Sequence, residues 1–125
     1  MSEEIVLEEL GESGITDLVA AFYRRSKKDD LIGPMYPDQD WEGSEQRLRD
    51  FMIYRLGGSQ KYIEERGHPR LRMRHAPFSI GVAERDRWLK LMGEAMVETQ
   101  VPERSSKWLA KFFDQTADFM RNKPE

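Results

Sequence analysis

Few side chains in this sequence could bind a soft metal ion. The 125 residues include two histidines and no cysteine, and His75 lies in the dense run from Gly67 to Phe78. A zinc site in a protein normally takes several His or Cys ligands, and an iron–sulfur cluster needs thiolates. Haem iron needs as little as one histidine from the protein, because the porphyrin supplies four ligands. Haem is therefore the metal cofactor that this composition best permits.

The two histidines are expected to have different roles. A lone histidine near apolar residues is more often a hydrogen-bonded packing residue than a ligand, so residue type alone leaves both interpretations of His75 open. His68 lies between Gly67 and Pro69, a setting typical of a turn in which the imidazole bonds nearby backbone. His75 is therefore the stronger candidate for metal binding.

Arginines are concentrated around His75. They are Arg66, Arg70, Arg72 and Arg74. Such a run is most simply a solvated charged face. A guanidinium group also recognises carboxylates and phosphates through its planar fork, and the two propionates of haem would be natural partners. Arg47, next to the apolar Leu48 on another predicted helix, would serve the opposite side in the same way.

Three aromatic residues combine an apolar ring with a hydrogen-bond donor. Tyr23, Tyr36 and Trp88 each lie in or beside an apolar stripe. Buried Tyr and Trp side chains usually find a partner for their polar atom, so the simplest role is a core aromatic bonded to backbone. If the three donors converged on one pocket, they would stabilise a partly negative ligand. Their positions in the sequence do not decide between these roles.

Helices must position all of these residues. Apolar residues recur at helical spacing and no stretch alternates as a strand does, so the predicted fold class is all-α. Ser44 is predicted to cap one helix and Gly57-Gly58 to end it. Glycines and prolines mixed with apolar residues at 57–81 indicate a long irregular segment that wraps something. The expected helices run from about residue 15 to 26, 44 to 56, 82 to 99 and 102 to 120.

The bulk properties indicate one globular domain over residues 1–125. The net charge of −3 argues against general nucleic-acid binding, which favours a basic surface. No apolar run approaches the length of a membrane span, and the acidic start Ser2-Glu3-Glu4 is unlike a secretory signal. The absence of cysteine fits a reducing cytosol. We expect a soluble, cytoplasmic protein that binds neither nucleic acid nor membranes.

Several stretches of the sequence match one known family. They are Phe22-Tyr23, Tyr36-Pro37, Gly57-Gly58, Tyr62, the run Gly67-His68-Pro69-Arg70-Leu71-Arg72-Met73-Arg74-His75-Ala76-Pro77-Phe78, Glu84-Arg85-Asp86 and Trp88-Leu89. With them the sequence resembles the group II truncated haemoglobins over roughly residues 15–121. The resemblance implies a shortened globin, a two-over-two helical sandwich that encloses one haem b.

The resemblance also implies roles for individual residues. His75 matches the proximal iron ligand, and Tyr23, Tyr36 and Trp88 match the polar residues of the distal side, where diatomic ligands bind. The remaining positions match distal-face residues (Ser44, Leu48), deeper pocket residues (Phe51, Met52), propionate contacts (Arg47, Tyr62, Arg74) and apolar haem contacts (Leu71, Phe78, Ile80). Two features depart from the family. Many relatives have alanine where this chain has Ser44, and the opening segment with Leu7, Leu10 and Gly11 lacks the usual aromatic residue.

We therefore expect a haem protein that binds dioxygen, nitric oxide and carbon monoxide. Several hydrogen bonds to the ligand would slow its release, which favours redox chemistry such as conversion of nitric oxide to nitrate, or a weak peroxidase activity. Two alternatives stay open. One is an oxygen carrier or sensor without turnover, and the other is a haem-free, arginine-rich, all-α binding module. A reductase partner is expected but not identified by the sequence, and the choice between monomer and homodimer is left open.

Overall fold

The structure is a computed structural model that describes residues 3–36, 40–67, 75 and 78–123. Five α-helices and a short 3-10 helix account for most of these residues, and none of them lies in a strand. The elements are α1 (Glu4–Ser26), η1 (Gly33–Met35), α2 (Trp41–Arg55), α3 (Lys61–Arg66), α5 (Val82–Glu98) and α6 (Glu103–Met120). The predicted all-α class is confirmed.

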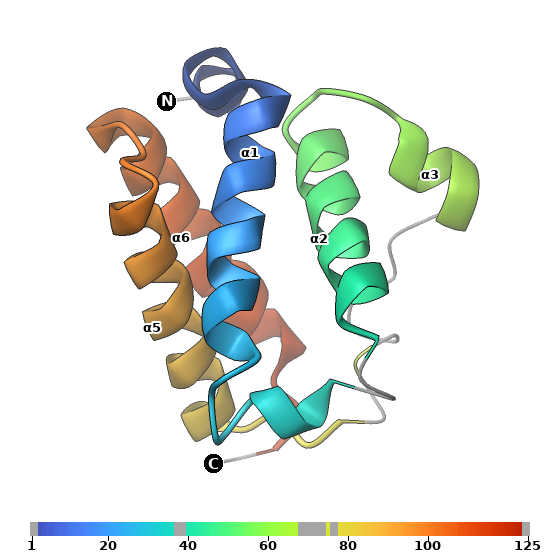
Figure 1. Ribbon diagram of the computed structural model, residues 1–125, viewed down its shortest axis with the longest axis vertical. Helices are drawn as coiled ribbons and strands as arrows, with labels where there is room; N and C mark the ends of the chain where they lie inside the picture. Colours follow the sequence, from blue (N-terminus) through green and yellow to red (C-terminus); the bar gives the residue numbers. More distant parts are fainter. Residues whose placement is uncertain (1–2, 37–39, 68–74, 76–77, 124–125) are drawn as a thin grey trace.

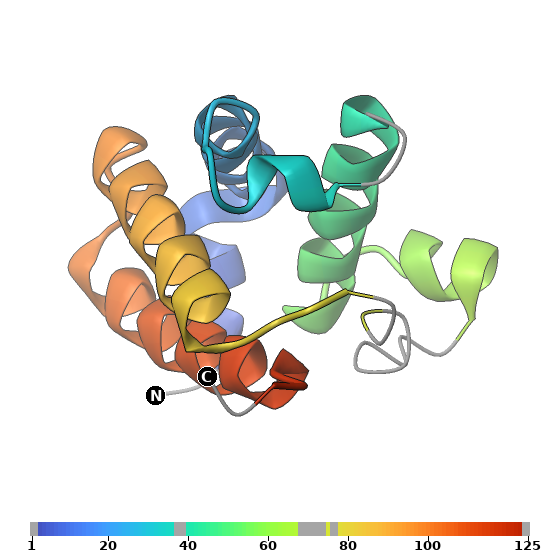
Figure 2. The same ribbon diagram turned by 90° about the horizontal axis from the view of Figure 1, so that it is seen from below.

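The longer helices form two packed pairs. Helix α1 contacts α2, α5 and α6, and α5 also contacts α6. Figure 1 shows α1 between α2 and α5, and Figure 2 shows α6 beneath α1 and next to α5. Helix α3 packs against α2 at the edge of this arrangement. The expected two-over-two arrangement is therefore present.

The core lies where α1 meets the other helices. Apolar side chains three or four positions apart put one stripe of α1 inside, as the sequence predicts. Leu109 of α6 and Met92 of α5 meet that stripe, and both are almost fully buried. The fully buried apolar side chains of α1 are Val6, Ile15, Leu18, Val19, Ala21 and Phe22.

Helix α1 includes a helical stretch before the predicted one. It begins at Glu4, and a kink at Gly11, whose backbone is not helical (φ 67°, ψ 173°), divides it into two helical stretches. Glycine adopts this positive φ without the penalty that a side chain brings, so it suits the junction between them. The kink also lets the N-terminal turn contribute Val6, which is completely buried.

Helix α2 has a different N-cap from the predicted one. The cap is Asp40, whose carboxylate Oδ1 accepts a hydrogen bond from the Gly43 N–H at 3.1 Å. A carboxylate is an effective cap and also suits the positive end of the helix dipole. Ser44 therefore lies inside the first turn, and its prediction as the cap is wrong. The predicted end at Gly57-Gly58 is confirmed, because the helix stops at Arg55 and Gly57 has φ +94°.

The segment at 57–81 is irregular, as predicted, in the parts that the structure describes. It contains the six-residue helix α3 and an extended stretch that leads into α5. Helix α5 starts with the Glu84 carboxylate accepting a hydrogen bond from the Gly81 N–H at 2.8 Å. Within the described ranges, no helix combines the length and the hydropathy that crossing a membrane would require.

Candidate functional site

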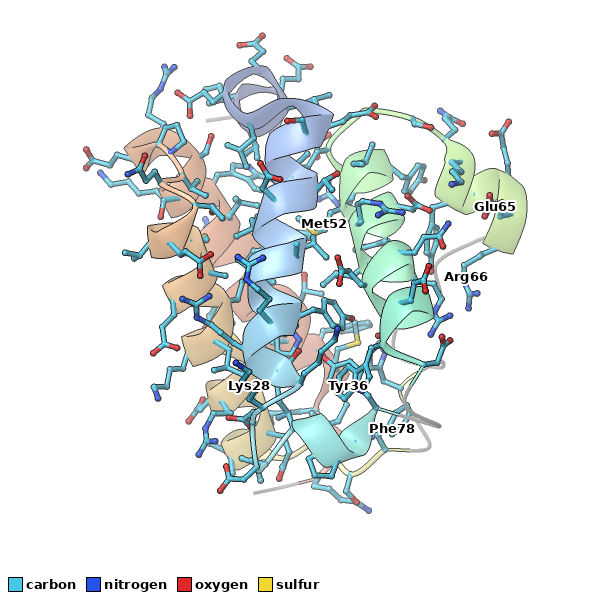
Figure 3. The ribbon with its side chains drawn as sticks, viewed as in Figure 1. Lys28, Tyr36, Met52, Glu65, Arg66 and Phe78 are labelled. Carbon is cyan, nitrogen blue, oxygen red and sulfur yellow. The ribbon has the colours of Figure 1, made fainter. Side chains whose placement is uncertain are left out.

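A single large pocket gathers the predicted site residues. Its volume is about 450 Å³, and its walls come from all five α-helices, from the turn after η1 and from the segment before α5. Figure 3 shows Tyr36 and Met52 between α1 and α2. The predicted residues that line the pocket are Tyr23, Tyr36, Ser44, Arg47, Leu48, Phe51, Met52, Tyr62, His75, Phe78, Ile80 and Trp88. Leu71 and Arg74 lie outside the described residues, as does His68.

Two tyrosines and a serine form the polar corner of the pocket. The hydroxyl of Tyr23 shares a hydrogen bond with the Ser44 hydroxyl at 2.7 Å. The ring of Tyr36 packs edge-on against that of Tyr23, with centroids 5.6 Å apart. Trp88 belongs to the same cluster through Phe22, whose ring centroid lies 5.0 Å from that of Trp88. The three predicted donors therefore converge on one part of the pocket.

Both tyrosine hydroxyls hold their protons firmly. Burial raises the pKa of Tyr23, and hydrogen bonding to Ser44 and to Tyr36 offsets only part of this effect. Burial also raises the pKa of Tyr36 well above its ordinary value, and the neighbouring Tyr23 raises it further. Hydrogen bonding to Ser26 and Trp88 acts in the opposite direction but does not outweigh burial. The pocket thus offers neutral hydroxyl groups as donors across the physiological pH range.

The turn that delivers Tyr36 is held by Asp29, which the sequence analysis did not single out. One carboxylate oxygen of Asp29 accepts hydrogen bonds from the N–H groups of Leu31 at 3.0 Å and Ile32 at 2.9 Å. The other oxygen accepts a hydrogen bond from the Arg87 guanidinium at 2.7 Å. These bonds close an aspartate turn and tie it to α5. The pair Asp29-Asp30 before an apolar residue was the available sequence signal for such a turn.

Apolar side chains make up most of the remaining wall. Helix α2 supplies Leu48, Phe51 and Met52, as predicted. Residues that the sequence analysis did not assign to the pocket are Ile32, Met35, Phe112, Phe113, Thr116, Ala117 and Met120. Most of these belong to α6, for which the sequence predicts a helix but no contact with a pocket. Periodicity identifies the buried face of a helix but does not distinguish a packed neighbour from a cavity.

His75 brings one imidazole to this apolar pocket. Its side chain is half-buried, and its ring centroid lies 6.4 Å from that of Phe78. Its carbonyl accepts the Phe78 N–H at 3.0 Å, which fixes the backbone next to it. In the part of the chain that the structure describes, no group of three or more His, Cys, Asp or Glu side chains is arranged to hold a metal ion. A single imidazole in an apolar pocket suits haem, because the porphyrin itself supplies four ligands to the iron.

Charged side chains also line the pocket. They are Arg47 of α2, Arg66 of α3, and Glu84 and Arg85 of α5. The guanidinium of Arg47 lies 3.4 Å from the Asp40 carboxylate, and that of Arg85 lies 2.6 Å from Asp118. Guanidinium groups beside an apolar pocket fit a flat, apolar group that carries carboxylates at its edge, as haem does with its propionates. The walls, the imidazole and these cations therefore all fit haem.

The chain is similar to known globins over nearly its whole length. The family model described as bacterial-like globin matches residues 6–122. The group 2 truncated haemoglobin YjbI of Bacillus subtilis is 35% identical over 118 residues, which are 94% of this chain and 89% of the relative. Two-on-two haemoglobin-3 of Arabidopsis thaliana is 28% identical over 123 residues, with 96% of this chain and 70% of the relative covered.

Solved structures extend the similarity to the arrangement of helices. A thermostable haemoglobin from Thermobifida fusca has a TM-score of 0.91 and 40% identity, with 100% of both chains covered. The group II truncated haemoglobin from Bacillus anthracis has a TM-score of 0.91 and 34% identity, with 100% of this chain and 94% of the relative covered. At these values, the described helices are arranged as in these haemoglobins.

Proposed function

This chain belongs to the bacterial-like globin family, among the group II truncated haemoglobins, and we propose that it uses dioxygen in redox chemistry at a haem iron held by His75. Family membership confirms the predicted fold and haem b as the cofactor, and it includes the binding of diatomic ligands. The observation that supports the finer proposal is that Tyr23, Tyr36 and Trp88 line the same pocket as His75. We also propose that residues 1–125 form one haem domain.

Two groups of residues would act in the pocket. One group would hold the haem, and the other would donate hydrogen bonds to the ligand on the iron. Haem supplies an iron that binds a diatomic ligand and exchanges electrons. We assign to His75 the ligand position on that iron. Arg47, Tyr62 and Arg66 lie at the pocket and would hold the propionate edge. Leu48, Phe51 and Phe78 would contact the macrocycle and keep water from it.

The three donors would then act on the bound ligand. The hydroxyl protons of Tyr23 and Tyr36 are retained because burial raises their pKa values, and the indole N–H of Trp88 does not titrate. A ligand that gains negative charge would be stabilised by each donor by about 1 kcal/mol, so two such bonds would slow its release roughly tenfold or more. Slow release favours turnover of the ligand over its delivery.

We propose conversion of nitric oxide to nitrate as the main reaction. Hydrogen peroxide that enters the pocket would meet the same donors, so a weak peroxidase activity belongs to the proposal. Repeated turnover requires an electron donor, and we expect a reductase partner that the chain itself does not identify. The cytoplasmic location and the choice between monomer and homodimer stay predictions.

Rapid mixing of the oxygenated protein with nitric oxide tests the reaction. We expect a fast change to the ferric spectrum with one nitrate formed per haem. Simple displacement of oxygen, followed by a nitric oxide adduct without nitrate, would assign the chain as a carrier or sensor instead. Protein that stays colourless and takes up no haem would favour the haem-free, arginine-rich binding module.

A second measurement tests the role of His75. His75→Gly should lose haem or retain it weakly, and added imidazole should restore the parent spectrum by occupying the space left by the side chain. Val97→Ala, on an exposed part of α5 away from the pocket, serves as the control and should bind haem as the parent does. Normal haem retention by His75→Gly without imidazole would refute the assignment.

A further inference from the structure

A single asparagine just beyond α6 is bound to the segment that precedes α5. The Asn122 Oδ1 accepts a hydrogen bond from the Ile80 N–H at 2.9 Å, and its Nδ2 donates to the Phe78 carbonyl at 2.7 Å. The Asn122 backbone N–H donates to the Ile80 carbonyl at 2.9 Å. A longer contact of 3.5 Å joins Nδ2 to the His75 carbonyl. One residue therefore holds the backbone at three positions of this segment.

The type of side chain matters for this contact. An amide has a donor and an acceptor on the same short side chain, and here each faces the complementary backbone group. Aspartate would keep the acceptor for the Ile80 N–H but would turn a second acceptor towards the Phe78 carbonyl. Helix α6 ends at Met120, and Arg121 is extended (φ −59°, ψ 134°), which directs Asn122 towards the segment.

The segment that Asn122 holds is part of the pocket. His75, Phe78 and Ile80 all line it. The backbone from Phe78 to Gly81 lies outside regular helix, so its N–H and carbonyl groups need hydrogen-bond partners from elsewhere in the chain. Asn122 supplies partners to the Phe78 carbonyl and to both polar groups of the Ile80 backbone.

The same contact joins the segment to the pocket wall made by α6. Met120 lines the pocket two residues before Asn122. Asp118 forms an ion pair with Arg85 of α5 at 2.6 Å, and a second with Arg121 at 3.3 Å. The end of α6 is thereby fixed to α5 on one side and to the His75 segment on the other.

We propose that Asn122 is a positioning residue that sets the orientation in which the His75 imidazole meets the haem iron. The inference rests on the proposed role of His75 as the iron ligand. Residues beyond the direct ligands tune a metal site by fixing the orientation of those ligands, and their loss typically lowers metal affinity about 10-fold to 100-fold. Asn122 acts through the backbone of the His75 segment rather than through the imidazole itself.

The test compares variants by the iron–imidazole stretching band in the resonance Raman spectrum of the reduced, ligand-free, haem-loaded protein. Asn122→Ala removes both side-chain bonds, and Asn122→Asp keeps the one to Ile80. We expect the band to shift and broaden in Asn122→Ala, and to shift also in Asn122→Asp, which turns an acceptor towards the Phe78 carbonyl. Haem transfer to an excess of a haem-free acceptor protein should become about tenfold faster in Asn122→Ala.

Ser105→Ala is the matched control. Ser105 is fully buried near the start of α6, and its hydroxyl bonds Glu9 of α1 at 2.5 Å, away from the pocket. This variant should lose stability as the Asn122 variants do while it keeps the parent band and rate of haem transfer. Comparing the variants at equal free energy of unfolding, measured with urea, removes the effect of general destabilisation.

Each outcome decides the question. A parent band in folded Asn122→Ala would overturn the positioning role, and so would an equal shift in Ser105→Ala. If Asn122→Ala does not fold, Asn122→Asp decides by the same two criteria. Variants that fold by circular dichroism but no longer hold haem, while Ser105→Ala holds it, would support the role. A parent band that persists in His75→Gly would instead refute the proposed function.

Discussion

The hydrogen bond between Tyr23 and Ser44 should carry a measurable coupling energy. The two hydroxyl oxygens lie 2.7 Å apart, and Tyr23 is only 3% exposed. Tyr23→Phe removes one hydroxyl but keeps the ring against Phe22 and Tyr36, whose centroids lie 5.3 and 5.6 Å away. The expected cost is therefore that of the hydrogen bonds to Ser44 and to Tyr36, about 1 kcal/mol each.

Ser44→Ala acts on the same bond from the other side. It leaves the buried Tyr23 hydroxyl without this partner, which costs about 1–2 kcal/mol. Alanine in place of serine inside α2 also gains up to about 0.5 kcal/mol of helix propensity, which obscures the single-variant result. A double-mutant cycle cancels the propensity term, because it is the same in both backgrounds. We expect a coupling energy of about 1 kcal/mol.

The assay is urea unfolding of the haem-loaded protein, followed by circular dichroism at fixed protein and haem concentrations. The parent, the two single variants and the double variant are compared at neutral pH. The double variant should be less destabilised than the sum of the single variants. Additive effects, with a coupling energy below about 0.3 kcal/mol, would refute the conclusion that this bond orders the polar corner of the pocket.

Three further predictions concern ligand release, acid stability and the core. Trp88→Phe should speed oxygen dissociation about fivefold, because one donor worth about 1 kcal/mol is lost. Asp29→Ala should cost roughly 2 kcal/mol at pH 7, through two backbone hydrogen bonds at about 1 kcal/mol each. Burial alone would raise the pKa of Asp29, but the Ile32 N–H, Arg87 and the Leu31 N–H together lower it below its ordinary 3.8. The charged form therefore contributes stability above about pH 4, and that contribution is lost as the pH falls through the lowered value. Leu109→Ala, at a completely buried position, should cost 2–5 kcal/mol.

Each of these three predictions has its own measurement and control. Stopped-flow measurement of oxygen dissociation should give the parent rate for Trp108→Phe, since Trp108 does not line the pocket. An unchanged rate in Trp88→Phe would remove the indole as a donor. Urea unfolding at pH 7 and at pH 3 should show the stability difference between the parent and Asp29→Ala shrinking in acid, and a constant difference would contradict the assigned cause. Val97→Ala, at an 80% exposed position, should cost less than 0.5 kcal/mol, and a similar value for Leu109→Ala would contradict its place in the core.

Features set by local sequence were predictable. The spacing of apolar residues gave the main helices, and Gly57-Gly58 marked the end of α2 because a positive φ is needed there. The run around His75 led to the correct family. The cap of α2 was predicted wrongly, since Asp40 and Ser44 are both suitable residue types and only the backbone geometry distinguishes them.

Features set by contacts across the fold were not predictable. Asn122 and Ile80 are 42 positions apart, and Asp29 and Arg87 are 58 positions apart. An asparagine near a terminus and an aspartate in a polar turn are common in any sequence, so neither residue type indicates its partner. The pocket face of α6 was not predicted either, because an apolar stripe has the same spacing whether it faces a packed helix or a cavity.

The most direct test of the central claim is the resonance Raman spectrum of the reduced, ligand-free protein, prepared with natural histidine and with ¹⁵N-labelled histidine. The proposed role of His75 predicts an iron–imidazole band that shifts with the label and disappears in His75→Gly. A band that does not respond to the label, or one that persists in His75→Gly, would show that another group holds the iron.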